Sequence, residues 1–176
     1  MAKLGLPLVG VDPAIVLSYR DEYKEILGTE RGDFHVLTAH EWLKQQLDNG
    51  TLLQHMKNAG KNDRTFEPHQ WYLFPHCTEI TAMPNSAKEW QQIFAAFTQQ
   101  LQVESVGCCG MAGTFGHETQ HIDMSKAIYV SSWTQKLQNR KPDYCLATGY
   151  SCRSQVKRFA HYQPKHPVQA LLTLFK

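Results

Sequence analysis

Short apolar runs alternate with longer amphipathic stretches along the 176-residue chain. The apolar runs have the length and composition of short buried strands, and they cover residues 6–11, 34–37, 71–75, 103–106 and 144–148. Stretches with helical periodicity follow them and predict helices over residues 13–27, 38–47, 86–101, 117–137 and 152–159, with a further helix that begins at Pro167. The alternation predicts an α/β fold, a three-layer αβα arrangement of the Rossmann-like kind, with helices on both faces of a mainly parallel sheet.

Capping signals support the first two of these helices. Asp12 is a suitable N-cap with Pro13 at the first helical position, and Thr38 with Glu41 three residues later has the spacing of a capping box. Residues 53–68 are polar and rich in turn formers, so we expect a loop or a short hairpin there. In the helix over 86–101, large apolar residues recur at helical spacing and predict a side that faces the core: Trp90, Ile93, Phe94 and Phe97.

Two adjacent cysteines at the head of a glycine-rich loop are the strongest chemical signal in the sequence. Cys108 and Cys109 are followed by Gly110, Gly113 and Gly116. Adjacent side chains on a strand point to opposite sides, so only an irregular loop can direct both thiols at one object, and the glycines give the backbone that freedom. Thiolates are soft ligands, which favours zinc, copper(I) or an iron–sulfur cluster at this loop.

Two further cysteines lie just beyond predicted strands. Cys77 follows the run at 71–75, and Cys152 follows the run at 144–148. Ligands of open α/β sheets bind at the carboxyl ends of the strands, so we expect Cys77, Cys152 and the adjacent pair to gather at one edge of the sheet. The alternative for Cys77 and Cys152 is burial as small apolar residues, and this is the favoured interpretation for Cys145, which lies inside an apolar run.

Composition restricts the classes of protein that fit these patterns. The formal net charge of +2 gives no support for a nucleic-acid partner. Five cysteines at uneven spacing, without a signal peptide, favour a reducing compartment over a disulfide framework. The sequence has no apolar stretch of membrane-spanning length, so we expect the protein in the cytoplasm, with a peripheral position at the inner membrane as the alternative.

Two other patterns offer weaker alternatives. The run His117-Glu118-x-x-His121 resembles the His-Glu-x-x-His metalloprotease signature, but it lies at the predicted start of a helix, where that signature would sit in the middle. The glycine spacing of the cysteine loop is not that of a dinucleotide-binding loop, and it lacks the Lys-Ser/Thr ending of a phosphate-binding loop. We therefore interpret His117 as a residue that forms a hydrogen bond beside a metal site, and the role of His121 stays open.

Four segments together resemble a known family. They are Phe74-Pro75-His76-Cys77, residues 107–116 around the double cysteine, residues 148–155, and His166-Pro167. The pattern is similar to the cysteine-rich "CCG" domain of the heterodisulfide reductases, of the iron–sulfur subunit of anaerobic glycerol-3-phosphate dehydrogenase, and of large FAD-linked oxidases of the D-lactate and D-2-hydroxyglutarate dehydrogenase kind. The resemblance covers the whole chain and is strongest to the last group.

The resemblance implies a bound iron–sulfur cluster, of the 4Fe-4S type, with four cysteine ligands: Cys77, Cys108, Cys109 and Cys152. Around these ligands we expect four residues that adjust or shield the cluster: His76, Gly110, His117 and Arg153. Family members with the complete motif end in Cys-x-x-Cys, whereas this chain has Gly149 at the first of these positions. The resemblance therefore supports cluster binding and electron relay more strongly than the reduction of disulfides.

The resemblance also implies a larger protein. Residues 1–27 look like the tail of a preceding copy of the domain, packed on the domain formed by residues 28–176, and the chain is expected to be the C-terminal piece of a longer polypeptide. Its expected partners are FAD-containing and ferredoxin-like domains of that polypeptide and an electron acceptor, either soluble or membrane-associated. The chain would relay electrons from the flavin in an FAD-dependent 2-hydroxy-acid oxidoreductase and would be inactive alone. The alternative is a zinc-binding or structural interaction domain without a redox role.

Overall fold

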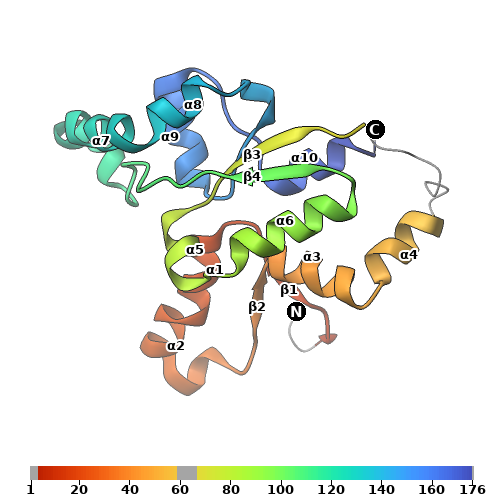
Figure 1. Cartoon of the computed structure of the whole chain (residues 1–176). Coiled ribbons are helices and arrows are strands. Elements are labelled where there is room, and N and C mark those ends of the chain that lie inside the picture. Colours follow the sequence, from red (N-terminus) through yellow and green to blue (C-terminus); the bar gives the residue numbers. More distant parts are fainter. Residues whose placement is uncertain (1–3, 59–66, 176) are drawn as a thin grey trace.

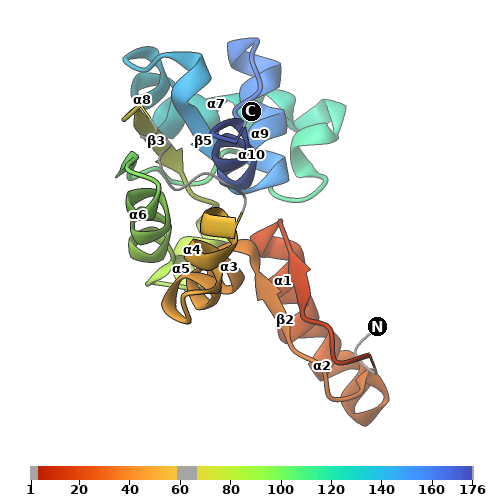
Figure 2. The same cartoon turned by 90° about the vertical axis from the view of Figure 1, so that its right-hand side faces the viewer.

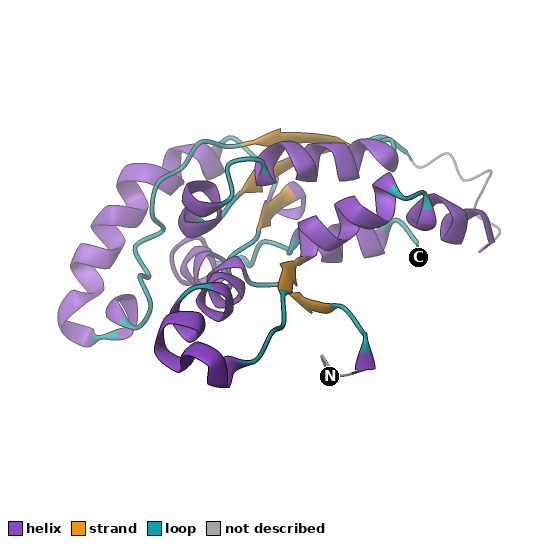
Figure 3. Cartoon of the chain, turned by 90° about the horizontal axis from the view of Figure 1, so that it is seen from below, coloured by secondary structure: helices purple, strands orange, loops and turns teal. Residues whose placement is uncertain are grey.

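The computed structural model describes residues 4–58 and 67–175, and the strands in these ranges form two parallel sheets. A two-stranded sheet pairs β1 (Leu8–Gly10) with β2 (Val36–Thr38). A three-stranded sheet has the order β4–β3–β5 and consists of β3 (Gln70–Phe74), β4 (Gln100–Val103) and β5 (Cys145–Ala147). Figure 1 shows the arrangement of the elements, and Figure 3 shows the helices that surround the short strands. The prediction of an α/β fold with parallel strands is confirmed, although the strands form two small sheets instead of one.

The smaller sheet belongs to an arm formed by residues 8–38. Between its two strands the chain forms three helical elements: α1 (Pro13–Arg20), α2 (Glu22–Leu27) and the 3-10 helix η2 (Gly28–Arg31). Asp12 caps α1 as predicted, because its Oδ1 accepts hydrogen bonds from the backbone N–H groups of Ala14 at 3.0 Å and Ile15 at 3.3 Å. Figure 2 shows this N-terminal arm extending away from the rest of the molecule, and α2 buries none of its residues.

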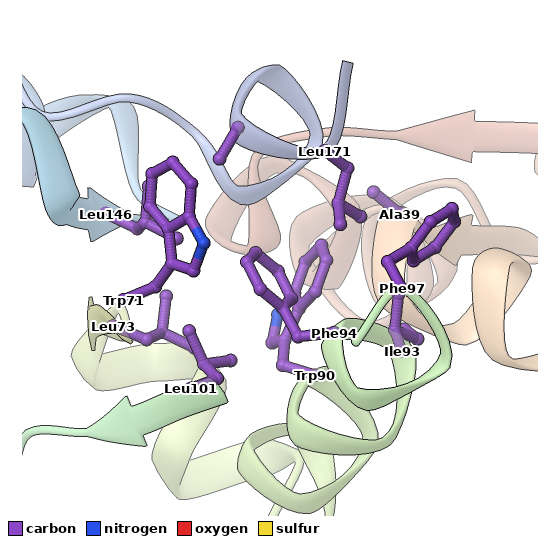
Figure 4. Packing of buried hydrophobic residues seen from close by; sticks show 11 residues of the cluster. Ala39, Trp71, Leu73, Trp90, Ile93, Phe94, Phe97, Leu101, Leu146 and Leu171 are labelled. Atoms are coloured by element: carbon purple, nitrogen blue, oxygen red, sulfur yellow. The ribbon is translucent and has the colours of Figure 1, made fainter. Parts of the chain in front are cut away.

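One face of the three-stranded sheet is covered by three helices: α3 (Ala39–Asp48), α6 (Ser86–Ala96) and α10 (Pro167–Thr173). Between these helices and the strands lies an apolar core that contains the predicted aromatic stripe of α6 (Figure 4): Ala39, Trp71, Leu73, Trp90, Ile93, Phe94, Phe97, Leu101, Leu146, Ala170 and Leu171. We call this side of the sheet the aromatic layer. The predicted capping box opens α3, since the backbone N–H of Thr38 donates to Glu41 Oε2 at 2.8 Å.

The opposite face carries a continuous helical segment and one separate helix: α7 (Ile122–Tyr129), the π-helical turn η5 (Val130–Thr134), α8 (Gln135–Gln138) and α9 (Tyr150–Ala160). The core on this side includes three of the five cysteines: Phe74, Cys109, Met111, Tyr129, Trp133, Leu137, Cys145, Ala147, Cys152 and Val156. We call this side the cysteine layer. Successive residues of a strand face opposite layers, which is why Leu73 packs in the aromatic layer and Phe74 in the cysteine layer.

Several predicted boundaries are wrong. The segment predicted as a loop over 53–68 begins inside a helix, α4 (Thr51–Asn58), and residues 59–66 lie outside the described ranges. The helix predicted over 86–101 ends at Ala96, because Thr98 adopts a φ of 58° that a helix does not tolerate. As a result β4 begins at Gln100, earlier than the strand predicted at 103–106.

The predicted helices 13–27 and 117–137 are both divided. The first breaks at Asp21 into α1 and α2. The second becomes a regular helix only at Ile122, because the preceding residues form two separate 3-10 turns, η3 (Phe115–His117) and η4 (Thr119–His121). Three further elements were not predicted: η2, directly after α2, α5 (Cys77–Ala82), directly after β3, and the 3-10 helix η6 (Pro142–Tyr144), directly before β5.

Within the described residues, no helix combines the length and the apolar character that crossing a bilayer requires.

A candidate cysteine-lined site

A cavity of about 370 Å³ lies beyond the carboxyl ends of β3 and β5. Residues from four parts of the chain line it: Asp12, Ala14, Ile15, His76, Cys77, Thr78, Cys108, Cys109, Ala112, Gly113, Tyr150 and Ser151. Three of the four cysteines predicted as ligands are therefore in its wall. The fourth, Cys152, is buried on α9 next to Cys109.

Cys77 is held by a turn that His76 organises. His76 is the N-cap of α5, and its Nδ1 accepts a hydrogen bond from the backbone N–H of Thr78 at 3.2 Å. Nδ1 is thus an acceptor, which leaves the proton on Nε2, where it donates to Ser151 Oγ at 3.2 Å. The His76 backbone N–H donates to Thr148 Oγ1 at 2.9 Å and so ties the turn to the end of β5. Burial lowers the pKa of His76, which keeps the ring neutral in this hydrogen-bonded position.

The double-cysteine loop depends on Gly110. This residue has a φ of 84°, and a Cβ placed on it would lie 2.2 Å from the carbonyl oxygen of Ser125. The close approach allows Ser125 Oγ to donate to the Gly110 carbonyl at 2.7 Å, while Gln155 Nε2 donates to Ser125 Oγ at 2.6 Å. The loop is therefore fastened to both α7 and α9. The Gly110 N–H donates to Cys108 Sγ at 3.3 Å, so the glycine also contacts one of the thiols.

Cys109 and Cys152 form a buried thiol pair. The hydrogen bond from the Cys152 thiol lowers the pKa of Cys109 to about 7, with smaller help from the Met111 N–H and from Ser151, against the opposing effect of burial. The same hydrogen bond raises the pKa of Cys152 well above its usual value, and burial adds to that rise. Cys109 is therefore the thiolate of this pair near neutral pH, and Cys152 is the donor that stabilises it.

Cys77 and Cys108 form a second, more accessible pair. Burial raises the pKa of Cys108, and the charge of Cys109 and a hydrogen bond to Cys77 contribute to the rise. Both Cys77 and Cys108 are partly exposed, whereas Cys109 and Cys152 are buried. Cys77 and Cys108 thus form an outer pair in the cavity wall, and Cys109 connects that wall to the inner pair that it forms with Cys152.

Two residues outside the predicted set shape the same cavity. Asp12 reaches from the N-terminal arm to α9, where its Oδ2 accepts a hydrogen bond from the Tyr150 N–H at 2.7 Å. The carboxylate therefore connects the starts of α1 and α9 at the cavity wall. At Gly149, a Cβ would lie 2.3 Å from Cδ2 of His76, so the absence of a side chain at this position makes room for the His76 ring.

Other predicted residues lie away from the cavity wall. His117 is exposed in η3, and His121 stacks on Phe115 with ring centroids 4.2 Å apart, so the two histidines do not share the face of one helix as expected. Arg153 lies behind the wall, with its guanidinium 6.0 Å from the centroid of the Tyr150 ring. Cys145 is buried in the cysteine layer at the start of β5, where its thiol contacts the Lys141 carbonyl at 3.5 Å.

The donor chemistry of the cavity fits a group that is bound by thiolates. Three cysteine thiols line it, a fourth (Cys152) is hydrogen-bonded to one of them, Cys109, and the N–H groups of Gly110 and Met111 donate to sulfur. Iron–sulfur clusters take four cysteine thiolates, and hydrogen bonds to their sulfurs adjust their reduction potentials. In the described ranges, no three His, Cys, Asp or Glu side chains are grouped so as to hold a single metal ion.

Comparison with known proteins finds relatives whose sequences align with this chain along its whole length. It is 69% identical over 176 residues to a D-2-hydroxyglutarate dehydrogenase of Haemophilus influenzae and 52% identical over 176 residues to one of Escherichia coli. In both cases the whole chain is covered, but it spans only 17% and 16% of the length of these relatives.

A more distant relative is one of the subunits of the anaerobic glycerol-3-phosphate dehydrogenase of Escherichia coli. It is 23% identical over 173 residues, which cover 95% of this chain and 40% of the relative. No protein-family model and no solved structure matches the chain.

Proposed function

Because this chain is homologous over its whole length to one segment of the D-2-hydroxyglutarate dehydrogenases, we propose that it is the iron–sulfur electron-transfer part of an FAD-dependent 2-hydroxy-acid oxidoreductase. The observation that carries the proposal is the convergence of two thiol pairs on one cavity, Cys77 with Cys108 and Cys109 with Cys152. The complete protein would oxidise D-2-hydroxyglutarate or a related hydroxy acid at a flavin outside this chain, since no side chain here can accept a hydride.

The residues of this chain have distinct roles in the proposal. The four cysteines would hold a 4Fe-4S cluster, which supplies one-electron transfer when bound. The N–H group of Gly110 donates to the Cys108 sulfur and stabilises negative charge there. His76 does not offer a free ring nitrogen, because Thr78 and Ser151 occupy both, and it therefore orients the Cys77 turn rather than binding metal. His117 and Arg153 have weaker support, because neither lines the cavity.

The N-terminal arm supports the proposal of a larger assembly. Seven of its large apolar or aromatic residues are exposed: Val9, Val11, Ile15, Tyr19, Tyr23, Ile26 and Leu27. We interpret residues 1–27 as the tail of a preceding copy of the domain and residues 28–176 as the cysteine-rich domain itself. The flavin-containing and ferredoxin-like domains of the longer polypeptide would cover this surface. In this proposal the protein works in the cytoplasm.

Anaerobic reconstitution of the chain with iron and sulfide tests the cluster assignment. We expect four irons per chain, roughly, for a site built from four thiolates, together with the paramagnetic resonance signal of a reduced cluster. Cys109→Ser should remove most of the iron, whereas the matched change Cys145→Ser, on a buried thiol outside the cavity, should leave it unchanged. Tight binding of zinc without incorporation of iron would favour the structural zinc domain instead.

A further inference from the structure

Two parts of the chain repeat the same arrangement of elements. In the C-terminal part, β5 leads through Gly149 into α9, and the chain then returns at Lys165, which forms a parallel bridge to Leu146 of β5, and enters α10. In the N-terminal part, β1 leads through Asp12 into α1, and the chain returns as β2, parallel to β1, and enters α3, with α2 and η2 added between α1 and β2. Each unit is thus a strand, a helix, a parallel return and a second helix.

The register of the two units agrees position by position. Val9 pairs with Leu37 in the first unit, and Leu146 pairs with Lys165 in the second. The residue directly after each of these partners opens the following helix with a capping box, and both of these helices pack in the aromatic layer. The N-cap of the first helix is the third residue after Val9 in one unit and the third residue after Leu146 in the other. Val9 and Leu146 therefore occupy equivalent positions.

The two units differ in what lies beside their first strand. On one side β5 is bridged to Lys165, and on the other side it pairs with β3, which runs parallel to it. β1 pairs with β2 on one side, and on the other side it has no strand partner among the described residues. We call that side the free edge of β1. An unpaired strand edge is a template for a further strand, and a sheet of two strands is marginal by itself.

The exposure of the equivalent residues shows the same difference. Leu146 is 0% exposed in β5, whereas Val9 is 40% exposed in β1. Val11 and Ile15, just beyond β1, are exposed as well, in an arm that extends away from the rest of the molecule (Figure 2). Parallel strands are normally buried on both faces. The arm therefore exposes apolar surface that β3 and its neighbours cover in the other unit.

We propose that the free edge of β1 binds a further strand, parallel to β1 and equivalent to β3, which the longer polypeptide supplies from outside these 176 residues. This partner is a short segment with large apolar side chains on both faces, as β3 has Trp71 and Leu73 on one face and Phe74 on the other. By the register of β3 on β5, Val9 faces the residue equivalent to Leu73. The chain spans only 17% and 16% of the length of two relatives, so most of such a polypeptide is available to supply the strand.

This strand addition rests on the larger protein of the proposed function, but it requires no cluster. The repeat also extends the preceding copy of the domain beyond residue 27, to the end of α3. A second copy of this chain is a poorer occupant of the edge. Two identical edges related by a twofold axis pair antiparallel, whereas the equivalent pairing of β3 with β5 is parallel.

Hydrogen–deuterium exchange, read by mass spectrometry, tests the strand addition on the 176-residue chain and on the longer polypeptide side by side. The amides of residues 6–12 should exchange at least about tenfold more slowly in the longer polypeptide, because the outward N–H groups of β1 gain acceptors there. The peptide over residues 143–149 is the internal reference. It contains β5, which already has partners on both sides, so it should exchange alike in both proteins.

Two valine variants separate strand addition from other effects of the larger protein. Val9→Lys places a charge where the equivalent Leu146 is fully buried, so it should return the exchange of β1 in the longer polypeptide to the rate of the 176-residue chain. Val130→Lys changes a valine of similar exposure in η5 and should leave the protection in place. Both side chains are exposed in the 176-residue chain, so circular dichroism of both variants of that chain should match the wild type.

Equal exchange of residues 6–12 in the two proteins would overturn the proposal, and so would protection that persists in Val9→Lys. Protection that arises in the 176-residue chain itself as its concentration rises, together with dimers in sedimentation, would assign the edge to a second copy and would also overturn it. None of these measurements uses iron, so failure of strand addition and failure of cluster incorporation are separate results.

Discussion

The three-stranded sheet separates two layers, and these layers differ in whether their buried polar side chains have hydrogen-bond partners. In the aromatic layer Glu79 is fully buried, yet it accepts hydrogen bonds from Trp90 Nε1 at 3.2 Å and from the Thr148 hydroxyl, with His40 Nδ1 only 3.7 Å from its Oε1. In the cysteine layer the side-chain hydroxyls of Tyr129 and Thr134 are buried, and neither has a hydrogen-bond partner among the described residues. The buried carboxylate of the aromatic layer has hydrogen-bond partners, whereas some buried hydroxyls of the cysteine layer have none.

The difference separates what stabilises the fold from what performs its chemistry. A buried polar network that is fully satisfied makes the surrounding core rigid, because breaking any member exposes the others. Unpartnered groups, cavities and a π-helical turn lower stability, and proteins retain them mainly where function needs them. We therefore expect changes in the aromatic layer to affect mostly stability, and changes in the cysteine layer to affect mostly the reactivity of the thiols.

Truncation of one aromatic ring in each layer should give the largest effect. Phe94 is 0% exposed in the aromatic layer, so Phe94→Ala should lower the free energy of unfolding by about 3–5 kcal/mol through lost burial and a new void. Phe159, which is partly buried against the cysteine layer, is the position compared with it, and Phe159→Ala should cost about 1–2 kcal/mol. Urea denaturation of both variants measures the two losses, and equal losses would remove the distinction between the layers.

Two glycines of the cysteine loop should differ in their tolerance of a methyl group. Gly110 and Gly113 both have positive φ, at 84° and 65°, but only at Gly110 would a Cβ meet the Ser125 carbonyl, whereas nothing lies within 4 Å at Gly113. Gly113→Ala should therefore cost about 1 kcal/mol for its backbone conformation alone, and Gly110→Ala at least about 2 kcal/mol. Urea denaturation checks the difference, and a smaller loss at Gly110 would mean that the loop is not fastened to α7 as described.

A fall in pH should weaken the aromatic layer through its buried histidines, and the contribution of His166 can be measured separately. His166 caps α10 with its ring Nδ1, and burial lowers its pKa to about 4. The unfolded chain has the ordinary value near 6.5, so the stability that the neutral ring contributes is complete above that pH and is lost as the pH falls toward about 4. Between pH 7 and pH 5 the contribution of His166 to the loss of stability should be about 2 kcal/mol.

The variant His166→Asn isolates this effect. Asparagine retains an acceptor for the cap but does not titrate, so unfolding in urea at the two pH values should show a smaller loss in the variant than in the wild type. The comparison between the two proteins removes the contributions of His40, whose pKa burial also lowers to about 4, and of the carboxyl group of Glu79, whose pKa burial raises. An identical pH dependence in both proteins would show that the His166 ring is not held neutral by the fold.

Much of the fold and part of the site could be predicted from local sequence patterns. Strand-like runs indicated parallel strands with cysteines directly after them, and helical spacing indicated the buried side of α6. Boundaries failed where one residue has an uncommon backbone conformation, as Thr98 does at the end of α6. Hydrophobic periodicity does not record such conformations.

The missed parts of the site depend on contacts between distant residues. Asp12 binds the Tyr150 N–H across 138 positions in sequence, and only its role as a helix cap leaves a local signal. Long-range hydrogen bonds and cavities follow from packing, which the order of residue types does not specify.

Substitutions in the inner thiol pair should change the stability least, although they should change the pKa of the Cys109 thiol strongly. In the iron-free chain the ultraviolet absorbance of the thiolate should report one group with a midpoint near pH 7, which is Cys109. Cys152→Ala removes the donor that favours the thiolate while burial remains, so the midpoint should move upward, at a cost of about 1 kcal/mol or less in stability. Cys109→Ser should remove the transition, and Cys145→Ser, the control, should leave it in place because Cys145 contacts Lys141 outside the pair. A midpoint that stays near pH 7 in Cys152→Ala would mean that another group stabilises the thiolate. The hydrogen bond between Cys152 and Cys109 would then not explain the reactivity that we assign to the cysteine layer.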